Sequence, residues 1–85
     1  MKVLIPSPLL SYTKTNRVEA AGGTIAEVLL DLDRQYPGLR FRVIDEQDHV
    51  RRHVALFVNR AACEDLVTPV SDADELHVLG ALSGG

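Results

Sequence analysis

The residue types that could do chemistry in this sequence are one cysteine, three histidines, a run of carboxylates and a closing pair of glycines. His49 and His53 stand four residues apart, a spacing that pairs two zinc ligands on a helix. Their segment reads as loop and strand, where this spacing separates the two side chains by about 13 Å. Since no cysteine ligand lies near them in the sequence, we expect no metal site there.

The carboxylates of Asp45, Glu46 and Asp48 lack the glycine and the downstream glutamate of a calcium loop, so we expect them to form a solvated turn. Cys63 has no histidine obviously paired with it, and a reactive cysteine needs an activating environment. A single cysteine cannot form an internal disulfide, which fits a reducing compartment. The sequence therefore predicts neither a metal centre nor a catalytic thiol.

The chain closes on Gly84 and Gly85. A glycine pair alone is weak support for a function, because such pairs are common at disordered ends and in linkers. A C-terminal carboxylate has a pKa of about 3.3 to 3.7 and is ionised at neutral pH, so it is a poor electrophile until it is activated. The two glycines gain meaning only from the fold that positions them.

The length of 85 residues allows one domain with a modest core. A net charge of −3 argues against nucleic-acid binding, which needs a basic surface. The apolar runs are too short to span a bilayer, and Pro6 interrupts the first one, so neither a membrane segment nor a signal peptide is expected. We expect a cytoplasmic protein that binds neither nucleic acid nor membrane.

Five arginines fall between Arg40 and Arg60, where they are interleaved with the three carboxylates of the solvated turn. Exposed charges of both signs usually form a solvated surface that contributes little to stability. The alternative is a docking patch for an acidic partner. The sequence favours the solvated surface and leaves the docking patch open.

The amino-terminal part predicts two strands and a helix. Lys2–Ile5 and Arg17–Ala20 read as a hairpin joined by a loose loop over Ser7–Asn16. Thr24 and Glu27 then have the spacing of a helix capping box. The apolar residues behind this box recur at helical spacing: Ile25, Val28, Leu29, Leu32 and Tyr36. Pro37 and Gly38 end this helix.

The second half predicts mainly strands. Leu39–Val43 reads as a short extended piece, His53–Asn59 as the strongest strand and Glu75–Leu79 as the last strand. The segment "LVTPV" offers at most a short edge piece, because Pro69 cannot donate to a sheet. One amphipathic helix among these strands must cover one face of a shared sheet.

This order predicts an α+β fold of the β-grasp (ubiquitin-like) type: a mixed sheet of four to five strands with one main helix on one face. The first and last strands would then lie side by side in the middle of the sheet. We expect the β-grasp domain to span residues 1–80, followed by a flexible tail over residues 81–85.

The whole chain resembles the MoaD/ThiS group of ubiquitin-like sulfur carriers, which are β-grasp domains ending in an exposed Gly-Gly. Within that group it looks most like the CysO-like carriers, which feed sulfur to cysteine biosynthesis and related thiocarboxylate pathways. The residues that carry the resemblance are "IPSPLLSYT", "TIAEVLLDLDRQYPGL", "DEQDHVRRHVALFVN" and "TPVSDADELHVLGALSGG".

The resemblance implies a carrier that is not itself an enzyme. Its partners would be a ubiquitin-activating-type (MoeB/ThiF-like) adenylyltransferase and a sulfur-accepting synthase. The first would use ATP and Mg²⁺ to adenylate Gly85, after which a sulfur donor displaces AMP and leaves a thiocarboxylate. Small residues suit a tail that threads into a buried ATP site, and Gly84, Ser83 and Ala81 are small. Leu82 is the one bulky tail residue and is expected to contact the partner, so the expected recognition residues are Gly84, Ser83, Leu82 and Ala81.

Alternation in the last strand places Leu76 and Val78 on the helix-covered face and His77 and Leu79 on the other face. With Phe57 of the neighbouring strand, the latter two would form an apolar patch for docking a partner. The alternative is that these are scattered surface apolar residues without a role.

Three other functions remain open. The chain could be a ubiquitin-like modifier joined to lysines through Gly85, a molybdopterin-type or thiamine-type sulfur carrier, or a β-grasp interaction module whose glycines are incidental. If the chain is a carrier, we expect it to need no trimming protease before activation, because the sequence closes on the glycine pair.

Overall fold

The structure is a computed structural model in which residues 1–80 are described. The predicted tail, which comprises Ala81, Leu82, Ser83, Gly84 and Gly85, lies outside the described residues. The elements follow in the order β1 (Lys2–Leu4), η1 (Ser7–Leu9), α1 (Leu10–Thr13), β2 (Arg17–Glu19), α2 (Ile25–Gln35), α3 (Leu39–Val43), β3 (Val54–Val58), β4 (Ala61–Ala62) and β5 (Glu75–Gly80).

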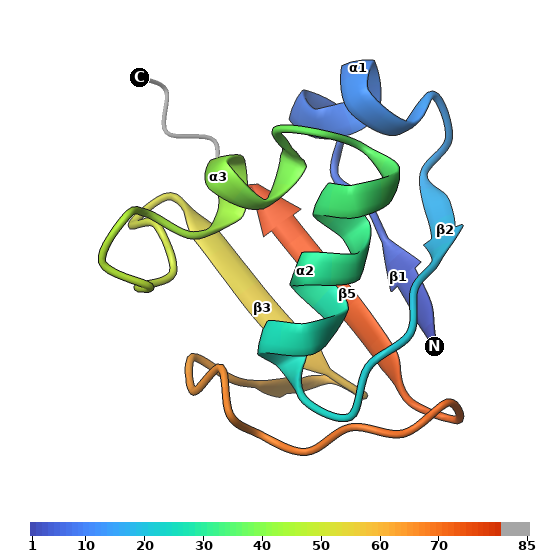
Figure 1. Ribbon diagram of the computed structural model, residues 1–85, viewed down its shortest axis with the longest axis vertical. Coiled ribbons are helices and arrows are strands. Elements are labelled where there is room, and N and C mark those ends of the chain that lie inside the picture. The colour runs from blue at the N-terminus through green and yellow to red at the C-terminus, as the bar shows by residue number, and fades with distance from the viewer. Residues whose placement is uncertain (81–85) are drawn as a thin grey trace.

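The strands form one mixed sheet of five strands in the order β2-β1-β5-β3-β4. The first and last strands, β1 and β5, pair in parallel, and the other neighbours are antiparallel. Figure 1 shows α2 crossing one face of this sheet. The predicted β-grasp architecture is therefore confirmed, with β5 next to β1 at the centre of the sheet.

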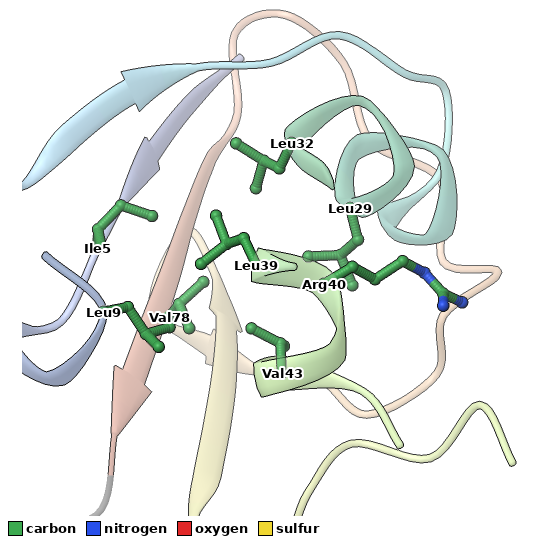
Figure 2. A pocket seen from close by; sticks show the side chains of 8 residues that line it. All are labelled: Ile5, Leu9, Leu29, Leu32, Leu39, Arg40, Val43 and Val78. Atoms are coloured by element: carbon green, nitrogen blue, oxygen red, sulfur yellow. The ribbon is translucent and has the colours of Figure 1, made fainter. Parts of the chain in front are cut away.

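The core lies between α2 and the sheet. The residues of the predicted helical stripe are buried at Ile25, Val28, Leu29 and Leu32, and Tyr36 packs against them. Leu39 and Val43 of α3 close one end of this core together with Leu9 and Val78, as Figure 2 shows. These side chains leave no space for a water molecule between them, so this end of the core holds no ligand cavity.

The start of α2 is fixed by the predicted cap. The Thr24 hydroxyl accepts from the Glu27 N–H at 3.2 Å. The Glu27 carboxylate accepts from the Gly23 N–H at 2.7 Å, one residue before the usual capping-box donor. Gly22 is required beside this turn, because a Cβ there would lie 2.7 Å from the Val28 nitrogen.

Two predictions are wrong. Leu39–Val43 is the short helix α3 and not an extended piece. It begins after Gly38, whose φ of 95° suits glycine, and the Asp33 carboxylate accepts from the N–H groups of both Gly38 and Arg40. The loop over Ser7–Asn16 is not loose either, since it contains η1 and α1.

Two smaller differences concern the sheet edge. The short strand β4 was not predicted. It pairs with β3 in an antiparallel manner, and the turn between the two strands contains Asn59 and Arg60, both of which have positive φ. The segment "LVTPV" contributes one isolated bridge, between Pro69 and Thr24. No helix in residues 1–80 is long and apolar enough to cross a membrane.

Candidate functional site

Strand β5 runs through the centre of the sheet and delivers the chain to Gly80, the last described residue. Gly80 lies opposite Val54, the first residue of β3. On its other side are two prolines, since a Cβ built on Gly80 would lie 3.4 Å from Pro8 Cγ and 3.8 Å from Pro6 Cβ. We call this place, defined by Gly80, Val54 and Pro8, the tail exit.

The outer face of the sheet, away from α2, carries a row of side chains across three strands. His77 on β5 lies opposite Phe57 on β3 and beside Leu4 on β1. Leu79 lies opposite Ala55 and is 48% exposed, whereas the alternate residues Leu76 and Val78 are buried. The predicted faces of the last strand are therefore confirmed.

These residues form the outer sheet patch, defined as Leu4, Ala55, Phe57, His77 and Leu79. Phe57, His77 and Leu79 are the residues predicted from the sequence to lie together, and the structure places them on neighbouring strands. Leu4 and Ala55 were not predicted, although the alternation around the buried Val3 and Leu56 indicates them. The docking role of the patch stays a prediction.

Charged side chains border the patch at one edge, beside His77. The His77 ring nitrogen Nε2 lies 3.2 Å from Glu75 Oε1, and Lys2 Nζ lies 3.8 Å from Glu75 Oε2. All three side chains are partly exposed, so water screens the pairs. The patch thus combines apolar side chains with one polar edge, a composition found in interfaces that form and dissociate.

Other candidate groups do not gather into a reactive site. Cys63 is partly buried, and its sulfur lies 3.1 Å from the Thr68 hydroxyl oxygen and 3.7 Å from the Asp65 carbonyl oxygen. Nowhere in residues 1–80 do three histidine, cysteine, aspartate or glutamate side chains group as metal ligands would.

Asp45, one of the three carboxylates expected to form a solvated turn, is hydrogen-bonded to the backbone of that turn. The Asp45 carboxylate accepts from the backbone N–H of His49 at 3.0 Å and of Gln47 at 2.9 Å. The His49 N–H is the main cause that holds the pKa of Asp45 below its usual value of 3.8. Asp45 therefore organises the turn that leads back towards β3.

The sequence is similar to known proteins over nearly its whole length. The sequence matches the ThiS family over residues 3–85. The sulfur carrier protein CysO of Mycobacterium tuberculosis is 32% identical over 89 aligned residues, which cover 98% of this chain and 96% of that protein.

The fold is also similar to solved structures of related proteins. The chain superposes on a structure of the Amycolatopsis orientalis BexX/CysO complex with a TM-score of 0.89, at 31% identity and with 99% and 98% of the two chains covered. The solution structure of the small archaeal modifier protein 1 from Methanosarcina acetivorans gives a TM-score of 0.82 at 26% identity, with 99% and 94% covered. Since the family match and the similarity to CysO both extend over nearly the whole chain, this chain belongs to the ThiS family of ubiquitin-like sulfur carriers.

Proposed function

We propose that this chain carries sulfur as a thiocarboxylate on Gly85 and donates it to the biosynthesis of cysteine or a related sulfur metabolite in the cytoplasm. The observation that supports this most is the path of β5. A strand held between β1 and β3 carries the sequence to Gly80, and "ALSGG" follows it. A rigid central strand gives a partner a fixed base from which to direct the tail.

The proposed chemistry has two steps. A MoeB/ThiF-like adenylyltransferase joins the Gly85 carboxylate to the α-phosphate of Mg²⁺-ATP, and pyrophosphate leaves. Hydrosulfide, or a donor equivalent to it, then attacks the acyl carbon, AMP leaves, and the carbonyl retains the sulfur. With hydrosulfide neither step changes an oxidation state. A sulfur-accepting synthase takes the sulfur afterwards, so this chain acts as a co-substrate and supplies no catalytic side chain.

The outer sheet patch is proposed to dock the chain on its partners. Leu79 stands next to Gly80, so a partner that covers Leu79 also contacts the base of the tail. Complex formation by a CysO protein with BexX supports docking of this kind. Beyond the patch, Leu82 is the one bulky tail residue and is expected to contact the partner. Gly84 and Gly85 lack side chains, so they let the end of the tail enter a narrow channel of the partner.

The test is pyrophosphate release by the activating enzyme with Mg²⁺-ATP. The intact chain should support release, and a chain lacking Gly84 and Gly85 should not, although its circular dichroism spectrum is unchanged. Equal release with both chains would contradict the proposal and favour an interaction module with incidental glycines.

The similarity to the small archaeal modifier protein 1 supports a second candidate, conjugation of Gly85 to lysines of other proteins. Both functions share the adenylation step and differ afterwards. Isopeptide-linked adducts of this chain, found by mass spectrometry of a cell lysate, would support the modifier. A thiocarboxylate without such adducts would support the carrier alone.

A further inference from the structure

We propose that a surface beside the tail exit, formed by Phe41, Arg42, Arg51 and Arg52, binds an acidic surface of the activating enzyme. We call these four residues the arginine collar. The proposal deepens the proposed function and rests on it, because it assigns this second surface to the enzyme that receives the tail. It takes up the docking patch for an acidic partner, the alternative that the arginine-rich segment left open in the sequence.

The collar is linked to the tail exit by a continuous set of contacts. Gly80 lies opposite Val54, and the Val54 N–H donates to the Arg51 carbonyl at 2.9 Å. The Arg51 Nε–H in turn donates to the Phe41 carbonyl at 2.6 Å. Figure 1 shows α3, which carries Phe41 and Arg42, beside the end of β5. These contacts place Arg51 and Phe41 next to the surface that a partner bound at the tail exit would cover.

Arg51 is held in one orientation. Its guanidinium carbon lies 4.5 Å from the centroid of the Phe41 ring, in addition to the hydrogen bond to the Phe41 carbonyl. A cation over an aromatic face is a favourable contact. Because Arg51 is ordered before a partner arrives, less side-chain entropy is lost when it binds a carboxylate.

Phe41 is placed outward although its helix packs on the core. Leu39 and Val43 of α3 are buried, whereas Phe41 between them is 54% exposed. An exposed aromatic residue with arginines beside it has the composition of the centre of an interface, where aromatic residues and arginine are enriched. Burial against a partner would account for a large apolar side chain in this position.

The charges of the collar are not neutralised by direct ion pairs within residues 1–80. Lys2, Arg34 and Arg40 each pair with a carboxylate, but the ion pairs of this part of the chain include none from the collar. The pKa of Asp45 is lowered mainly by the His49 N–H and only slightly by the charge of Arg51, and its carboxylate already accepts from two backbone N–H groups. The guanidinium groups of the collar therefore have no carboxylate in direct ion-pair contact among residues 1–80.

The collar also differs in sign from the rest of the chain. The net charge is −3, and residues 61–80 contain five carboxylates without any lysine or arginine. A local positive surface on an acidic protein favours one orientation of approach to a partner with an acidic surface. Arginine suits carboxylates because its planar fork can bind both oxygens at once.

The test uses two charge reversals that flank the same strand. Arg52 stands two residues before β3 and Arg60 two residues after it, and both are exposed. Binding of the full chain to the activating enzyme is measured without ATP, at low and at high salt. We expect Arg52→Glu to weaken the Kd about tenfold at low salt and less at high salt, and Arg60→Glu to change it by less than about twofold.

Equal effects of the two reversals would overturn the proposal, because overall charge and not the collar would then be responsible. It would also be overturned if Arg52→Glu raised the KM for ATP and left the Kd of the chain unchanged, since the arginine would then serve the nucleotide. Failure of the proposed function would look different, because the wild-type chain would bind with salt-sensitive affinity and never become a thiocarboxylate. Circular dichroism of both variants checks that they are folded.

Discussion

Gly80 at the end of β5 lies directly opposite Val54 at the start of β3. This pairing brings two surfaces to the same place. The outer sheet patch reaches the tail exit through Leu79 and Ala55, and the arginine collar reaches it through Arg51. A partner that receives the tail can therefore contact an apolar face and a basic end at the same time.

Leu79→Asp is expected to weaken binding to the activating enzyme at least tenfold while the fold is kept. Burial of a leucine side chain contributes about 1.5 to 3 kcal/mol, and a charge in its place would have to be desolvated. Val67→Asp is the matched control, since Val67 is 70% exposed and lines a hollow beside Ala26 and Asp48 that includes no residue of the patch. The measurement is the Kd by isothermal titration calorimetry. An unfolded Leu79→Asp protein would show that Leu79 belongs to the core.

Leu32→Ala is expected to lower the free energy of unfolding by about 2 to 5 kcal/mol, because Leu32 is only 1% exposed and its loss leaves a cavity. Leu30→Ala on the same helix should change it by less than about 0.5 kcal/mol, as Leu30 is 56% exposed. Urea denaturation of the two variants measures the difference. Similar midpoints for both would mean that the buried stripe of α2 is misassigned.

Gly22→Ala should destabilise the protein by about 1 to 3 kcal/mol, because its new Cβ would lie 2.7 Å from the Val28 nitrogen and 2.8 Å from the Glu27 carbonyl carbon, both of which are backbone atoms. Gly23→Ala is the control, where the nearest atom is Glu27 Oε1 at 3.4 Å and can move. Thermal melting compares them. If Gly23→Ala proved the more harmful change, the tight approach at Gly22 would be refuted.

Asp74 should make the stability of the folded protein depend on pH in the acidic range. The Ser71 N–H and then the Asn59 amide hold the pKa of Asp74 below its usual value of 3.8. The unfolded chain binds the proton more readily, so this stabilisation is present above pH 3.8 and is lost as the pH falls through the folded-state pKa. Asp74→Asn should lower the urea midpoint at neutral pH and flatten its decrease in acid. Glu46→Gln, at an exposed position, should change neither.

The elements with long periodic patterns could be predicted from the sequence. The stripe from Ile25 to Leu32 and the alternation in Glu75–Gly80 each repeat often enough to indicate both the element and its buried face. Thr24 marks where the helix begins. The central pairing of β1 with β5 followed, because one helix among these strands fits few sheets. These elements also fix which residues surround the base of the tail.

The short elements could not be predicted in the same way. In "LRFRV" the apolar and basic residues alternate as in a strand, yet Leu39 and Val43 also have the i,i+4 spacing of a helix. Five residues do not separate these periods, and the hydrogen bonds of Asp33 to Gly38 and Arg40 decide for the helix. The misread helix is the one that exposes Phe41, so the arginine collar was not visible as a surface.

The mass of the C-terminal residue tests the central claim most directly. After incubation with the activating enzyme, Mg²⁺-ATP and hydrosulfide, the intact chain should gain the difference between one sulfur and one oxygen atom, confined to Gly85. Deletion of Gly85, or addition of one residue after it, should reduce this gain at least about a hundredfold, because the reacting carbonyl is displaced from the α-phosphate. Cys63→Ser should leave it unchanged. Sulfur on Cys63, or equal modification of the truncated chain, would contradict the account.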